Sequence, residues 1–186
     1  MKIYYTARES FEKKSDPKGW EFYQKGSRLK HCTEIVSVDS LLNNYLVEAD
    51  LNDGKTYDYL LYSERNDTGL YYDLQFVLQN VYVEHPYNLM ACVVNPDQDC
   101  SKFNIENFEF VGYDLLDKSY DISALTNCGG FPETFLLSDQ NQYGLIDDFE
   151  KAFDIKKRLL ENNPHEFHAD CNVIALWRHK TIGRIN

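Results

Sequence analysis

The chain lacks most of the short motifs that identify a function directly. Among its 186 residues there is neither a G-x-x-x-x-G-K-[ST] nor a G-x-G-x-x-G phosphate-binding pattern, and the G-x-S-x-G turn of α/β-hydrolases is missing too. Its five cysteines are an odd number without the spacing of a disulfide framework. We therefore expect free thiols and no nucleotide or other cofactor.

Long apolar runs are scarce as well. The longest are segments such as Met90-Ala91-Cys92-Val93-Val94, well below the roughly 20 residues that a membrane-spanning helix needs. The first nine residues, MKIYYTARE, lack the apolar region of a signal peptide. We expect a cytoplasmic protein without a membrane partner, in a compartment that keeps thiols reduced.

Positive charge is scarce in the middle of the chain. Residues 39–150 hold 21 of the 30 acids and only four bases, which gives this block a net charge of −17 within a chain of net −11. An acidic protein is a poor general ligand for nucleic acids, because phosphate contacts provide most non-specific affinity. The charge favours instead a protein partner with a basic surface.

Aromatic residues are plentiful, with 14 Tyr, 11 Phe and 2 Trp, and we interpret most of them as strand residues. Apolar or alternating segments predict strands at 2–7, 34–38, 89–94, 108–115 and 171–177. The last of these is apolar enough to lie centrally in a sheet. Asn52-Asp53-Gly54-Lys55 between 45–51 and 56–62 predicts a hairpin, and 108–115 with 122–125 predicts a second one. The polar segment 10–30 is predicted to be loop-like or mobile.

The clearest helix is predicted over about 145–161. Leu145, Phe149, Ala152, Phe153 and Leu160 recur on one face of it, with Ile155 and Leu159 at the edge of that face. Helical spacing also favours a helix over 70–81, although the β-rich residues 81–83 leave a strand open there. The predicted fold is a single α+β domain over residues 1–186, with a mixed or mostly antiparallel sheet and the 145–161 helix packed on it.

One candidate reaction centre is the turn Thr126-Asn127-Cys128-Gly129-Gly130. Glycines behind a thiol let a backbone approach a substrate and offer N–H groups to an oxyanion. His165 or His168 is the expected base, oriented by Asp170 or Asn172. The order of Cys, His and Asp or Asn is similar to that of papain-like thiol hydrolases. A glycine-rich turn with a buried cysteine is the alternative interpretation.

A second candidate is a zinc site at His165, His168 and Cys171, whose H-x-x-H-x-x-C spacing contains ligand types that zinc uses. Cys128 is a possible fourth ligand. An extended segment would send the two histidines to opposite faces, so ordinary polar residues between a helix and a strand are the favoured interpretation. Similarly, capping and solvation account for Asp114, Asp117, Asp147 and Asp148 better than metal binding does.

Weighed together, these observations favour a binding module, an inhibitor or immunity-like protein, that docks a basic partner. In charge, size and expected fold the chain is similar to the immunity proteins that bacteria make against nuclease toxins, a likeness of composition with no shared motif. A thiol hydrolase or transferase using Cys128 with His168 or His165 is the alternative, and a zinc-stabilised domain is the third hypothesis. An enzyme is the less favoured class.

Overall fold

The computed structural model describes residues 1–14, 16–26, 29–40, 69–81, 87–120, 122–127, 131 and 134–183. The predicted hairpin at 45–62, residues 82–83 of the alternative strand, and Cys128 with its two glycines lie outside the described residues.

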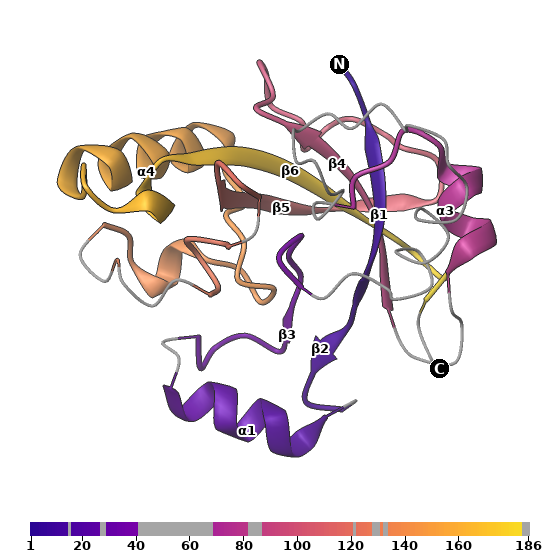
Figure 1. Ribbon diagram of the computed structural model, residues 1–186, viewed down its shortest axis with the longest axis horizontal. Coiled ribbons are helices and arrows are strands. Elements are labelled where there is room, and N and C mark those ends of the chain that lie inside the picture. The colour runs from indigo at the N-terminus through magenta and orange to yellow at the C-terminus, as the bar shows by residue number, and fades with distance from the viewer. Residues whose placement is uncertain are drawn as a thin grey trace.

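The described elements form one four-stranded sheet, one two-stranded sheet and three α-helices (Figure 1). In chain order these are β1 (Tyr4–Glu9), β2 (Phe11–Glu12), α1 (Pro17–Gly26), β3 (Glu34–Ile35), α3 (Leu74–Asn80), β4 (Tyr87–Val94), β5 (Phe108–Asp117), α4 (Phe149–Asn162) and β6 (Cys171–His179), with single 3-10 turns η1 (Leu137–Asp139) and η2 (Phe167–Ala169). The larger sheet has the order β1-β4-β6-β5, the smaller one pairs β2 with β3, and all strand pairs among the described residues are antiparallel. The predicted α+β fold is confirmed.

The larger sheet is buried on both faces, which explains its apolar central strand. In β6, Val173, Ala175 and Trp177 face the cluster that contains α3 and α4, whereas Ile174 and Leu176 face the opposite cluster. Successive side chains of a strand point to opposite sides, so a strand covered on both faces reads as a continuous apolar run. The prediction that 171–177 lies centrally in the sheet is confirmed, since β6 runs between β4 and β5.

Helix α4 begins four residues later than predicted and is rotated. Asp148 caps it by accepting a hydrogen bond from the Lys151 N–H at 2.7 Å. The fully buried side chains are Ala152, Ile155 and Leu159, while Leu160, predicted on the apolar face, is 44% exposed. The predicted face was therefore centred on the wrong residues, because it included Leu145, which lies before the helix.

Two further predictions need correction. The segment 10–30, predicted to be a loop, contains β2 and helix α1. Residues 122–125 do not form the second strand of the predicted hairpin: they form a turn that pairs with β5 through one isolated bridge, Ser123 to Leu116. The partner strand of β5 is β6. The helix predicted within 70–81 is confirmed as α3. Within the described residues, no helix has the length and apolarity to cross a membrane.

The helix α1 and the β2–β3 sheet form a small unit beside the larger sheet (Figure 1). Trp20, Leu29, Cys32 and Ile35 make its own apolar cluster. The Tyr23 hydroxyl ties this unit to the rest of the chain by donating to the Thr126 carbonyl at 2.8 Å.

A buried ion pair makes a second tie between the unit and the larger sheet. Arg178 of β6 donates from Nη1 to Glu34 of β3 at 2.6 Å and from Nη2 to the Tyr143 hydroxyl at 3.0 Å. The guanidinium also lies 4.7 Å from the Tyr143 ring centroid. A pocket lies where this small unit meets the turn that contains Thr126.

Candidate functional site

The structure gives the predicted partners of Cys128 other contacts. His168 lies in η2 with its Nδ1 at 2.8 Å from Asp117 Oδ2, so the residue that orients it is Asp117 and not Asp170 or Asn172. Asp170 instead forms an ion pair with Lys118 at 3.3 Å, and His165 is exposed. The position of Cys128 relative to these histidines stays a prediction, since that residue lies outside the described part of the chain.

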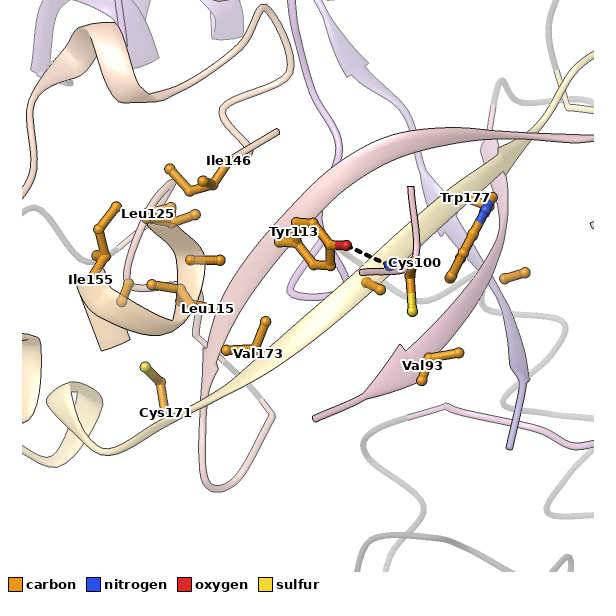
Figure 2. Packing of buried hydrophobic residues seen from close by; sticks show 14 of the residues in the cluster. Val93, Cys100, Tyr113, Leu115, Leu125, Ile146, Ile155, Cys171, Val173 and Trp177 are labelled. Atoms are coloured by element: carbon orange, nitrogen blue, oxygen red, sulfur yellow. Dashed lines mark hydrogen bonds between the residues drawn. The ribbon is translucent and has the colours of Figure 1, made fainter. Parts of the chain in front are cut away.

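The proposed zinc ligands are likewise not gathered. Cys171 is fully buried at the start of β6, within the core beside Val173 and Ile155 (Figure 2). No group of three His, Cys, Asp or Glu residues capable of holding a metal ion occurs among the described residues. Since His165, His168 and Cys171 are all described, this part of the chain does not bring them together.

Four cysteines are free and buried: Cys32, Cys92, Cys100 and Cys171. Burial raises the pKa of Cys32 and Cys100 to about 11 and that of Cys92 and Cys171 to about 12. A thiol with a raised pKa holds little thiolate near neutral pH and is a weak nucleophile. These four side chains are therefore core residues, as the labelled Cys100 and Cys171 in Figure 2 illustrate.

Two acids assigned to solvent from the sequence are in fact fully buried. Asp114 and Asp117 of β5 both have no exposed surface. Asp117 accepts from the Ser119 hydroxyl at 2.9 Å as well as contacting His168, and it closes the end of the strand. Asp114 lies in the fully buried part of β5 between Tyr113 and Leu115, where a carboxylate is unfavourable unless it is hydrogen-bonded.

Asp114 is held by three hydrogen-bond donors from three segments. Ser37 and Ser123 donate their hydroxyls to its two oxygens, each at 2.5 Å, and the Leu115 N–H donates at 2.8 Å. Burial, and after it the negative charge of Asp39, raises the pKa of Asp114 to about 7, against the lowering effect of those donors. The protonated form of this carboxyl group is therefore populated at pH values where an exposed aspartate is fully ionised.

Asp39 is the second carboxyl group of this network. It accepts from the Ser123 N–H at 2.9 Å, and its own N–H donates to the Ser37 hydroxyl at 3.2 Å. Burial raises the pKa of Asp39, although hydrogen bonds from Ser123, Ser37 and Asn127 and the positive charge of Arg8 act to lower it. Ser37 and Ser123 thus connect two carboxyl groups, and the ionisation of either one disfavours the ionisation of the other.

Asp39 also lines the pocket of about 240 Å³ between the small unit and the Thr126 turn. Ser40 and Asn127 continue its wall on the side of Asp39, and Glu9 with Ser10 forms the wall at the junction of β1 and β2. Because the three donors occupy the fully buried Asp114, Asp39 is the carboxyl group of the pair that reaches the pocket. The site offers anionic and hydroxyl groups to a ligand.

The pocket adjoins the predicted Cys128 turn, but its acidic partners were missed. Thr126 and Asn127, which the sequence singled out as the start of that turn, both line it. The only sequence signal for Asp114 is an acid inside the apolar strand Phe108–Asp117, and nothing in the sequence pairs it with Asp39 75 positions earlier.

Comparison of the chain with protein-family models, with characterised proteins and with solved structures finds no match, so that the residues described above carry the functional argument.

Proposed function

We propose that this protein is a binding module that docks a partner with a basic surface through its exposed carboxylates. The observation that carries the proposal is a set of seven exposed acids within residues 39–150 that form no ion pair with any described residue. They are Asp73, Asp97, Asp99, Glu106, Asp147, Asp148 and Glu150.

The ion pairs after residue 150 support this interpretation by contrast. Of the four exposed acids there, three have basic neighbours, in the Asp154–Arg158 pair at 3.0 Å, the Glu161–Lys157 pair at 3.8 Å and the Asp170–Lys118 pair at 3.3 Å. Uncompensated charge concentrated in one block raises the local potential, speeds encounter with an oppositely charged protein and disfavours acidic partners.

Two groups of these acids adjoin a single buried side chain, Tyr113. Its hydroxyl donates to Asp99 at 2.9 Å, in the β4–β5 connection. Its ring centroid lies 5.8 Å from that of Phe149, the residue between Asp148 and Glu150. The fixed Tyr113 therefore brings the acids of the β4–β5 connection and those at the start of α4 to neighbouring parts of the surface.

The form of docking that we infer is a distributed interface of the inhibitor or immunity-like kind, in the cytoplasm. Four free, buried thiols suit a reducing compartment. A small acidic protein that covers a basic enzyme needs no reaction centre of its own, and its affinity depends on charge complementarity together with a few well-packed contacts.

The test is capture of partners from cell extract by three immobilised proteins. The first is the wild type, and the second carries Asp97→Lys, Glu106→Lys and Glu150→Lys, whose carboxylates accept no hydrogen bond from the described residues. The control carries Glu21→Lys, Glu161→Lys and Glu166→Lys, which changes the net charge equally at exposed acids outside the 39–150 block.

The proposal expects a basic protein, in a defined ratio, on the wild type and the control, and at least about tenfold less of it on the second variant. Equal retention by all three proteins, or retention of partners that are not basic, would overturn the proposal.

A further inference from the structure

The pocket beside Asp39 has a chemical character that the surface acids do not explain. Of its described lining residues, Glu9 and Asp39 carry carboxyl groups and none is basic. The positive charge that acts on Asp39 is that of Arg8, which is 5% exposed and donates to Thr6 Oγ1 at 3.1 Å and to the Ser40 carbonyl at 3.2 Å. Asp114 lies behind Asp39 and adds a third carboxyl group.

The Glu9 carboxylate is available to a ligand. It lies on the last residue of β1 and is partly buried, and no described residue gives it a hydrogen bond or an ion pair. A carboxylate held partly out of water interacts with a cation more strongly than one on open surface, because the effective dielectric constant is lower.

Apolar and aromatic side chains form the remaining wall. The Phe11 and Tyr23 rings meet edge to face with their centroids 5.2 Å apart, and Ile35 lies beside them in the lining. Ring faces and edges of this kind accommodate an aliphatic chain, and they attract ammonium or guanidinium groups through the ring quadrupole.

One polar atom at the pocket has no partner. Thr126 lines the pocket and is 7% exposed, and its Oγ1 is buried without a hydrogen bond to any described residue. A buried hydroxyl without a partner is unfavourable by about 1–3 kcal/mol. Its oxygen has almost no accessible area as placed, so a rotation of the Thr126 side chain would be needed to present it to a ligand N–H in the pocket.

We propose that this pocket binds a single ammonium or guanidinium group carried on a short aliphatic chain. Glu9 and Asp39 would neutralise the charge, Phe11 and Tyr23 would contact the chain, and Thr126 Oγ1 would accept an N–H. The volume of about 240 Å³ is below the roughly 300 Å³ at which pockets for drug-sized ligands begin. One side chain or one small amine is therefore the right size.

This chemistry has two sources, a lysine or arginine side chain of a protein and a free amine. The assignment to a protein side chain rests on the proposed function, whereas the proposal that the pocket binds such a cation does not. Calorimetric titrations with butylguanidinium, with its uncharged counterpart butylurea, and with the peptide acetyl-Gly-Arg-Gly-amide separate the sources. Binding of both cations supports a protein-borne side chain, and binding of butylguanidinium alone supports a free amine.

The expected result is saturable binding of butylguanidinium, at least about tenfold tighter than that of butylurea. Glu9→Gln and Asp39→Asn should each weaken it by about tenfold or more, whereas the exposed controls Glu106→Gln and Asp97→Asn should leave it unchanged. Thr126→Val removes the hydroxyl at nearly constant shape and should weaken binding in a folded protein. Circular dichroism and thermal unfolding establish that each variant is folded.

Equal binding of butylguanidinium and butylurea, or no binding of either, would overturn the pocket proposal. So would butylguanidinium binding that Glu9→Gln leaves unchanged in a folded protein. The triple charge reversal at Asp97, Glu106 and Glu150 should not alter butylguanidinium binding, so failure of the pocket and failure of the acidic docking surface give different results.

Discussion

Replacing Asp114 with asparagine should change how the stability of this protein depends on pH. Burial and the charge of Asp39 raise the Asp114 pKa from 3.8 to about 7. Between these values the folded state holds almost one proton more than the unfolded state, in which the carboxyl group is ionised. The free energy of unfolding must then fall as pH rises, by about 1.4 kcal/mol per pH unit from this group.

Asparagine imitates the protonated carboxyl group at every pH. Its oxygen can accept from Ser123 and the Leu115 N–H, and its amide can donate to the Ser37 hydroxyl, which rotates to accept. From pH 5 to pH 6.5, the wild type should therefore lose about 2 kcal/mol more stability than Asp114→Asn does. Carboxyl groups remote from this pair contribute equally to both proteins and cancel in the difference. Asp39 does not cancel, because asparagine removes the negative charge of Asp114 beside it, so the difference reports the Asp39–Asp114 pair.

The assay is urea unfolding at a series of pH values, followed by the fluorescence of the buried Trp20 and Trp177. Asp97→Asn serves as the control, because it removes an exposed carboxylate and should run parallel to the wild type. If the Asp114→Asn curve also runs parallel to the wild type over this range, the buried carboxyl group is not protonated in the folded state and the reasoning fails.

Three other predictions follow from the packing. The four buried cysteines should react with iodoacetamide only when the protein unfolds. Peptide mass spectrometry of the native protein then measures the labelling of Cys128 without interference from the other four. A labelling rate of Cys128 above that of an ordinary free thiol would favour the thiol-enzyme alternative. Glu34→Ala leaves Arg178 buried without its closest carboxylate and should lower the unfolding free energy by about 3 kcal/mol. A loss below about 1 kcal/mol would contradict the inference that the Glu34–Arg178 pair holds the small unit on the larger sheet. Ile155→Ala should lower the unfolding free energy by about 3 kcal/mol, and the matched Leu160→Ala should lower it by less than about 1 kcal/mol. The reverse order would mean that Leu160 and not Ile155 faces the core, as the sequence pattern predicted.

The sequence predicts best those elements whose pattern is local. The continuous apolar run of β6 indicated a central strand, because a sheet covered on both faces leaves few polar positions. Helix α4 was predicted from its periodicity, but Leu145 drew the predicted face away from Ile155 and Leu159. The true start was also readable, since Asp148 is an N-cap residue type followed by helix-forming residues.

Helix α1 has a helix-start signal in its sequence that the polar, glycine-containing composition of the segment obscured. Asp16 accepts from the Gly19 N–H at 3.0 Å, and Pro17 occupies the first helical position, which is a typical helix start. The glycine content and the polar character of the segment favoured a loop. The aromatic residues Trp20 and Tyr23, whose rings pack on Phe11, stabilise the helix through tertiary contacts.

The candidate site could not be predicted because its parts are distant in sequence. Glu9, Asp39 and Thr126 meet only after β2 and β3 pack beside the Thr126 turn, and a charge count cannot distinguish Asp114, which is buried, from Asp97, which is exposed. The excess of acids in 39–150 was visible from the sequence. Which of those acids are without ion pairs became visible only with the side-chain contacts.

The most direct test of the docking proposal measures the dissociation constant for the captured basic partner as a function of salt. Surface charges are screened over about 8 Å at physiological ionic strength and less at low salt. The account predicts that raising salt from about 50 to 300 mM weakens wild-type binding at least about tenfold, mainly through a slower association rate. It also predicts that the Asp97, Glu106 and Glu150 charge reversal removes most of this dependence. A dissociation constant that salt and charge reversal both leave unchanged would contradict the account.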